Sequence, residues 1–211
     1  MGTDIFSLLQ NMSPEELKVF QNITMFREAR KSWECFEEVL HKLLLKASVS
    51  LAQSRNHLTF DKTSEDGYSD VLLKILEQYK DYGLITTREE NNGGHCDISI
   101  SFGGFKWLGE AKKAKSYDWV YDGFLQLCTR YSTCDSLSKS GGLIIYCGQK
   151  KAGTFMTSWM AHLKLKFNDI QDHENHTEDP NIKITKHTHG VSENTYKVIH
   201  IPVYLNYTPE K

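Results

Sequence analysis

The fold of this chain is decided by residues 95–112, which read HCDISISFGGFKWLGEAK. In the first half, polar and apolar residues alternate, so that Asp97, Ser99 and Ser101 share one face of a predicted strand. Two glycines follow between two aromatic residues, a pattern typical of a two-residue hairpin turn, which needs positive φ angles. The stretch therefore predicts two antiparallel strands joined at the glycine pair.

The turn also fixes how the two strands pair. If Phe102 pairs with Phe105, Asp97 lies directly opposite Glu110, where side chains are about 5 Å apart. Two carboxylates at this distance repel each other unless a proton or a cation lies between them. Lys112 stands two residues beyond Glu110 and therefore points to the same face.

A patch of two carboxylates and one amine suits a divalent metal. Hard carboxylate oxygens bind Mg²⁺ or Mn²⁺ and leave positions for water and a substrate phosphate. Such a metal stabilises charge on phosphoryl oxygens and lowers the pKa of a bound water, and Lys112 could orient or deprotonate that nucleophile. The alternative is a surface hairpin with a Glu–Lys pair on its solvated face.

Helices and strands are predicted on both sides of the hairpin. Before it we expect a helix over 64–82, ended by Gly83, and a strand over 84–89. After it we expect a helix over 118–131, a strand over 142–147, a helix over 154–167, a loop over 168–181 and strands over 182–187 and 196–205. Pro202 suggests that the last strand is a sheet edge. This order predicts an α/β fold with a mixed central sheet flanked by helices.

The N-terminal section, residues 14–46, is predicted to be helical. It forms an N-terminal helical extension over 1–58, ahead of a domain over 59–211. Ser13 and Pro14 give a helix start, and Trp33, Leu40 and Leu44 belong to an apolar stripe at helical spacing. The stripe can serve as a homodimer or partner surface, or it can pack against the rest of the chain.

At this point the residues resemble a known family. Asp97, twelve intervening residues, and then Glu110-Ala111-Lys112 resemble the motif of the PD-(D/E)XK, or restriction-endonuclease-like, nuclease superfamily. The predicted element order over 64–147 is similar to that of the superfamily's core, although Cys96 stands where the family often has proline. The resemblance implies a restriction-endonuclease-like core and a Mg²⁺- or Mn²⁺-dependent nuclease. Asp97, Glu110 and the Ala111 carbonyl would then bind the metal, and Lys112 would position or activate the attacking water.

The helix before the hairpin offers a further acidic residue, which the resemblance places in the metal site. Asp66 and Asp70 belong to a polar row that indicates the solvated face, whereas Glu65 borders the buried stripe and faces the sheet. We therefore assign Glu65 to the metal. Its alternative role is that of a helix-dipole partner in the first turn.

The helix after the hairpin offers substrate contacts. Gln126 and Arg130 lie one turn apart on the same face, and we assign Gln126 to the site and Arg130 to a phosphate. An ordinary exposed helix row is the alternative. Lys113 and Lys115 follow the motif and could hold backbone phosphates, although single lysines of this kind are often simply solvated.

Composition and charge are compatible with a nucleic-acid substrate. The 211 residues carry 25 Lys and Arg against 27 Asp and Glu. Residues 103–166, however, hold ten basic and four acidic residues, so the acidic surplus lies elsewhere. Five cysteines without a Cys-x-x-Cys pair, and the lack of a long apolar run, favour a cytoplasmic protein without membrane contact.

The sequence thus predicts a Mg²⁺-dependent (endo)deoxyribonuclease, with DNA as the expected substrate because the resemblance implies it. The resemblance also suggests an effector of a restriction or antiphage defence system. Two alternatives remain open. One is an RNA-directed or toxin-type hydrolase on the same fold, and the other is a non-catalytic nucleic-acid-binding or assembly subunit.

Overall fold

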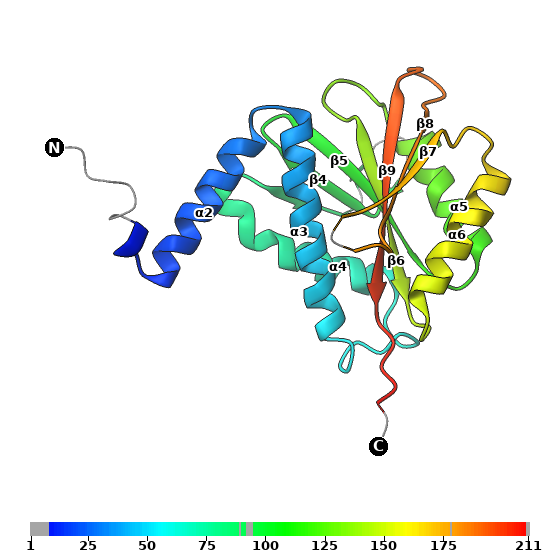
Figure 1. Ribbon diagram of the computed structural model, residues 1–211, viewed down its shortest axis with the longest axis horizontal. Coiled ribbons are helices and arrows are strands. Elements are labelled where there is room, and N and C mark those ends of the chain that lie inside the picture. Colours follow the sequence, from blue (N-terminus) through cyan, green and yellow to red (C-terminus); the bar gives the residue numbers. More distant parts are fainter. Residues whose placement is uncertain (1–8, 89, 92–94, 178, 210–211) are drawn as a thin grey trace.

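A seven-stranded mixed sheet organises the molecule, with helices on both of its faces (Figure 1). The computed structural model describes residues 9–88, 90–91, 95–177 and 179–209. In spatial order the strands are β1 (Ile85–Thr87), β4 (Ile98–Phe102), β5 (Phe105–Lys113), β6 (Ser140–Cys147), β9 (Thr195–Tyr204), β8 (Lys183–Thr188) and β7 (Asp172–Asn175). β6 runs parallel to both β5 and β9, whereas the other neighbours are antiparallel. The predicted α/β class with a mixed sheet is confirmed.

The two faces of the sheet are covered by different helices. On one face lie α2 (Pro14–Ala29), α3 (Trp33–Gln53) and α4 (Glu65–Leu76), the last followed by a 3₁₀ turn over Glu77–Tyr82. On the other face lie α5 (Tyr117–Gln126), which continues as a π-helical turn over Leu127–Tyr131, and α6 (Ala152–Lys166). Buried residues of the central strands therefore face one of two separate apolar cores, according to the alternation of the strand.

The central hairpin has the predicted register. Phe102 pairs with Phe105, and the ladder ends where Ile98 pairs with Gly109. The turn glycines, Gly103 and Gly104, have φ angles of 59° and 98°, which residues other than glycine adopt only with strain. The single strand predicted over 95–102 is nevertheless interrupted at Asp97. A short β3 (His95–Cys96) pairs with β2 (Glu90–Asn91) in a separate two-stranded sheet.

The helix predicted over 14–46 is two helices. The chain turns between Arg30 and Ser32, and the Ser32 side chain accepts a hydrogen bond from Cys35 N to begin α3. α3 then runs past its predicted end as far as Gln53, because Leu51 continues the buried stripe.

The apolar stripe of α3 packs inside this chain. Phe36 and Leu40 are buried in the same core as Trp107 and Ile144 of the sheet, so the predicted parts 1–58 and 59–211 share one core. This face of the helix is consequently not a free surface, and of the two roles open for the stripe, packing against the rest of the chain is the one observed.

The last strand is not a sheet edge, contrary to the expectation from Pro202. β9 lies between β6 and β8, but β8 begins only at Lys183, opposite His200. Leu205 N donates to Cys147 O of β6, so strand alternation turns the Pro202 nitrogen toward the other side, beyond the first residue of β8. The missing N–H therefore leaves no gap in the ladder.

The predicted loop over 168–181 contains β7, which pairs antiparallel with β8. In the part of the chain that the structure describes, no helix combines the length and the apolar character needed to cross a membrane.

Candidate active site

The site arises because the two strands of the hairpin differ in length. β4 begins at Ile98, whereas β5 continues beyond Gly109 to Lys113. The N–H groups of Ala111 and Lys113 point toward the β4 side but lie past its end, since the intervening residues turn toward β6. These two donors need partners other than a strand.

Two of the predicted acids satisfy these donors. Ala111 N donates to Asp97 Oδ2 at 2.9 Å, and Lys113 N donates to Glu65 Oε1 at 2.7 Å. The carboxylates thus continue the hydrogen bonding of the sheet where β4 has ended. Main-chain geometry, rather than a surface ion pair, holds Asp97 and Glu65 at the end of β5.

A buried ion pair lies on the α5 side of the same strand. Glu110 is 2% exposed and Lys112 is 9% exposed, and Lys112 Nζ donates to Glu110 Oε1 at 2.6 Å. No hydrogen-bond donor of the described residues reaches the second oxygen, Oε2, which is also buried. A buried carboxylate oxygen without a donor is costly, so the site has room for one more positive or hydrogen-bonding group.

The pKa values of Glu110 and Asp97 indicate that this additional group belongs between their two carboxylates. Burial raises the pKa of Glu110 to about 7, and the charge of Asp97 adds to this rise, although the bond from Lys112 opposes it. Burial also raises the pKa of Asp97, against the opposing effects of its bond from Ala111 N and the charge of Lys112. Near neutral pH the two carboxylates therefore favour a shared proton or a cation.

Lys112 itself is an ammonium. Burial works to lower the pKa of Lys112, but its hydrogen bond to Glu110 and the charges of Glu110, Asp97 and Glu65 outweigh burial, and the pKa is raised. The side chain therefore carries a positive charge at neutral pH. In this state it donates hydrogen bonds and balances negative charge.

Glycine in α5 allows the helix to cover this ion pair closely. A Cβ atom on Gly123 would lie 2.7 Å from Lys112 Cγ and 3.3 Å from Glu110 Cγ. Glycine inside a helix is otherwise unfavourable by roughly 1 kcal/mol relative to alanine. That cost is the signal by which the close contact of Gly123 could have been predicted from the sequence.

Glu65 lies at the end of β5, where its Oε1 atom accepts the hydrogen bond from Lys113 N. Its Oε1 atom also accepts a hydrogen bond from Trp119 Nε1 at 2.7 Å. The Trp119 ring is thereby held 5.4 Å from Lys112 Nζ and 5.3 Å from Lys115 Nζ, measured to the ring centre. Among the described residues, no three His, Cys, Asp or Glu side chains gather closely enough to hold a metal ion.

The other two acidic residues of α4 lie on its solvated side, as their spacing predicted. Asp66 and Asp70 are exposed and both pair with Arg88, at 2.8 and 3.1 Å. They accordingly lie on the solvated side of α4, whereas Glu65 contacts the sheet.

A pocket of 430 Å³ opens beside Lys112. Its lining residues come from α5 and the π-helical turn, together with the lysine: Lys112, Trp119, Asp122, Leu125, Gln126, Thr129 and Arg130. The structure therefore brings Gln126 and Arg130 together with Lys112, as the helical spacing predicted. The Gln126 Oε1 atom is buried and accepts no hydrogen bond from the described residues.

Lys113 is separated from this pocket. Strand alternation turns its side chain to the opposite face of the sheet, where Nζ donates to Phe60 O and lies 4.6 Å from the centre of the Phe60 ring. It is buried and bonded there, so it does not share a surface with Lys112. Lys115, in contrast, is exposed beside Trp119.

Comparisons of this chain with protein-family models, with curated proteins and with solved structures found no match. The chemistry of the residues at the end of β5 is therefore what a functional proposal can rest on.

Proposed function

We propose that this protein is a metal-dependent nuclease that hydrolyses phosphodiester bonds at the end of β5. One observation carries the proposal: Glu110 is buried beside Asp97, is bonded to Lys112 through one oxygen, and has no donor for the other. The order α4, β1, β4, β5, α5, β6 agrees with the core expected from the resemblance, which supports a restriction-endonuclease-like fold.

The residues present fit a hard divalent cation. Asp97 and Glu110 would supply carboxylate oxygens for Mg²⁺ or Mn²⁺. The carbonyl of Ala111 would supply a third, because it points to the same strand edge as the N–H that binds Asp97. When bound, the metal would stabilise negative charge on the phosphate and lower the pKa of a water. Glu65 is not included in this group, because one oxygen, Oε1, accepts bonds from both Lys113 N and the Trp119 indole, and the described acids form no cluster of three.

In this proposal Lys112 positions the attacking water and does not deprotonate it. As an ammonium bonded to Glu110, it keeps that carboxylate oriented and presents its remaining N–H donors to a water or to a phosphate oxygen. Charge that develops on the phosphoryl oxygens then meets a fixed positive group in a site from which α5 excludes solvent.

The pocket beside Lys112 supplies the substrate contacts. Arg130 and the nearby exposed Lys115 place positive charge where a phosphate backbone would pass. The Gln126 amide has an unused oxygen, and the Trp119 ring offers a surface on which a base could stack. DNA is the proposed substrate, and a role in restriction or antiphage defence is proposed from the resemblance alone.

Incubation with nucleic acids tests the proposal. The full chain is incubated with plasmid, single-stranded DNA and RNA, each with Mg²⁺, with Mn²⁺ and with EDTA. Cleavage is expected with metal and not with EDTA. It should fall by at least about 10²-fold in Glu110→Gln and Lys112→Ala, but not in Lys164→Ala, an exposed lysine on α6.

Three outcomes oppose the proposal in different ways. Cleavage that survives both Glu110→Gln and Lys112→Ala would exclude this site as the catalytic centre. Metal-independent binding of nucleic acid without any cleavage would support the non-catalytic alternative, and cleavage of RNA alone would support the RNA-directed one.

A further inference from the structure

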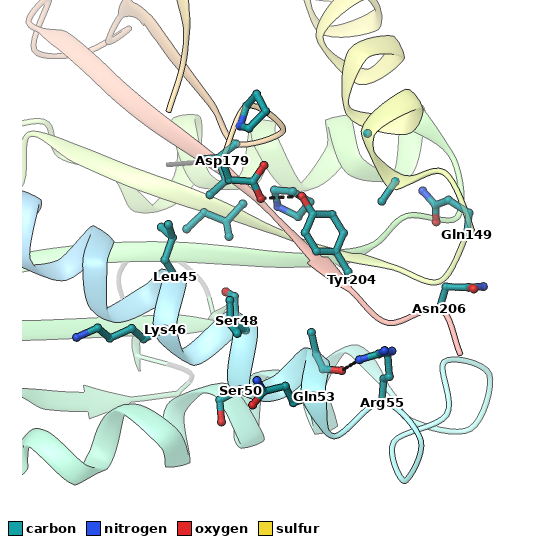
Figure 2. Close-up of a pocket in the computed structure, with 18 of the residues that line it drawn as sticks. Leu45, Lys46, Ser48, Ser50, Gln53, Arg55, Gln149, Asp179, Tyr204 and Asn206 are labelled. Carbon is teal, nitrogen blue, oxygen red and sulfur yellow. Dashed lines mark hydrogen bonds between the residues drawn. The ribbon is translucent and has the colours of Figure 1, made fainter. Parts of the chain in front are cut away.

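A second and larger cavity lies on the α3 face of the sheet, opposite the face that carries Glu110 and Lys112. Its volume is 1210 Å³. Figure 2 shows that it is bordered by the second half of α3, the end of β9, the segment that leads into α6 and the loop before β8. Sites for small ligands usually measure about 300–1,000 Å³, so this cavity has room for more than a simple ion or sugar.

One wall of the cavity is apolar. Ile182 and Ile201 are buried and form part of the core beneath it, and Leu45, Val49 and Pro202 continue the same wall. Val49 is more than half exposed although it is a large aliphatic residue. Such a wall suits the flat or apolar part of a ligand.

Ser48 presents an unused polar group to this cavity. The residue is 6% exposed, and its Oγ atom is buried without a hydrogen-bond partner in the described part of the chain. Figure 2 shows Ser48 on the side of α3 that faces Tyr204 across the cavity. The Nε2 atom of Gln149, at the opposite rim, is buried without an acceptor in the same way. A ligand that bonds to these groups would remove a desolvation cost that the empty cavity carries.

Basic residues from several elements line the cavity. Lys46, Lys150 and Lys151 line it without an ion pair to any described residue, and Arg55 uses one guanidinium nitrogen to bond Ala52 O. Among the described lining residues Asp179 is the single acid, and it already accepts hydrogen bonds from Tyr204 OH and Asn181 N.

The start of α6 adds positive charge beside Lys150 and Lys151. The helix begins at Ala152 after Lys151, and no side chain caps its first turn. The first backbone N–H groups of a helix have no partner inside the helix, and they carry the positive end of the helix dipole. Ala152 and Gly153 of this turn line the cavity together with the two preceding lysines. Phosphate groups are the anions that such an arrangement binds best.

We propose that the cavity binds a phosphorylated small molecule of nucleotide or dinucleotide size. Its phosphates lie at the start of α6 against Lys150 and Lys151, its ring system lies against the apolar wall, and Ser48 donates or accepts one hydrogen bond. This inference is independent of the nuclease proposal, because the cavity and the catalytic residues lie on different faces of the sheet.

Isothermal titration calorimetry on the full chain tests the proposal. The probes are ATP, GTP, the dinucleotide pApA and inorganic phosphate, all in EDTA so that metal-dependent binding does not contribute. At least one nucleotide is expected to bind with a Kd below about 100 μM, and inorganic phosphate more weakly than about 1 mM. A single strand of DNA 20 nucleotides long serves as a further probe.

Four variants locate the binding. Lys151→Glu should raise the Kd of the nucleotide at least about tenfold, because it reverses a charge beside the proposed phosphate site. Ser48→Ala should raise this Kd about fivefold, the usual effect of losing one hydrogen bond. Val49→Trp should block the cavity without disturbing the core, since Val49 is exposed. Lys18→Glu, the same charge reversal on the exposed side of α2, should change nothing.

Three results would overturn the proposal. The first is that no nucleotide binds with a Kd below about 1 mM. The second is that Arg130→Ala, in the pocket beside Lys112, abolishes binding while Lys151→Glu and Val49→Trp retain it. The third is that the DNA strand binds and the nucleotides do not. Circular dichroism of each variant confirms that the fold is intact.

Discussion

Gly123 of α5 lies directly over Lys112 of β5, so close that a Cβ atom on Gly123 would come within 2.7 Å of Lys112 Cγ. The same atom would also crowd Glu110 Cγ at 3.3 Å. The helix therefore packs directly against the buried ion pair and restricts its movement. The presence of glycine at this one position is a condition for the geometry of the candidate site.

Gly123→Ala is expected to harm both stability and activity. Alanine would gain helix propensity of about 1 kcal/mol, but overpacking against Lys112 costs about 1–3 kcal/mol, so a net loss in the free energy of unfolding is expected. Displacement of the ammonium should lower cleavage at least about tenfold. Urea unfolding and a cleavage assay measure the two effects.

Gly190→Ala is the matched control, because nothing lies within 4 Å of a Cβ atom placed there. If Gly123→Ala proves as harmless as Gly190→Ala, the close packing of α5 on Lys112 does not matter for the site.

Glu110 should make stability depend on pH. Its folded pKa, about 7, is raised above the ordinary value of 4.5, so its contribution to stability is fully present below about pH 4.5 and is lost as the pH rises through about 7. Relative to Glu110→Gln, the wild type should lose up to about 3 kcal/mol across that range. Urea unfolding in EDTA at several pH values measures the difference, and parallel curves for the two proteins would contradict it.

Mg²⁺ should reverse this loss if the nuclease proposal holds. Above about pH 7 Glu110 is ionised and available, so Mg²⁺ at 100 times its Kd should add about 2.7 kcal/mol to the free energy of unfolding. Near pH 5 protons compete for Glu110, and the gain should be small. A rise in Tm with Mg²⁺ that persists in Glu110→Gln would place the ion elsewhere.

Glu65→Gln distinguishes a metal ligand from a positioning residue. The structure bonds this carboxylate to Lys113 N and to the Trp119 indole, so we expect the substitution to weaken nucleic-acid affinity through Trp119. The Mg²⁺ concentration for half-maximal cleavage should change by less than about twofold. An increase of about tenfold or more in that concentration would instead assign Glu65 to the metal.

His187 should make the protein sensitive to acid. Burial lowers its pKa to about 4, so the stability it contributes is present above about pH 6.5 and is lost as the pH falls through about 4. The ring packs among Phe124, Phe167 and Tyr196, and its Nδ1 atom has no described partner.

His187→Phe keeps these ring contacts and removes the titration. We therefore expect the variant to equal the wild type near pH 7 and to exceed it near pH 4 by about 2–3 kcal/mol in the free energy of unfolding. An identical acid transition for both proteins would show that His187 is not responsible.

Local patterns predicted the hairpin well. Two adjacent glycines between Phe102 and Phe105 are enough to set the turn, and the turn sets the pairing from Phe102 back to Ile98. The predicted pairing of Asp97 opposite Glu110 does not form, because the ladder ends at Ile98 and Gly109; Asp97 instead accepts a hydrogen bond from Ala111 N, next to Glu110. The helical spacing of Gln126 and Arg130 likewise placed both on one side of α5 and its π-helical extension.

Contacts between distant parts of the chain were not predictable in this way. The partner of Glu65 is Trp119, 54 positions away, and no periodicity in either segment indicates that bond. The interruption at Asp97 and the enclosed position of Pro202 both depend on where a neighbouring strand ends. Such ends are set by tertiary packing rather than by the residues of the strand itself.

The unequal lengths of β4 and β5 have a consequence for solubility. An open strand edge with vacant N–H donors is a template on which another chain can add a strand, and proteins commonly block such edges with charge. Asp97 and Glu65 occupy the two donors of β5 that β4 leaves vacant, and they do so with negatively charged groups. The acids at the candidate site thus also keep these donors from pairing with another chain. A chain that lacked both acids would expose a strand edge in its own central sheet.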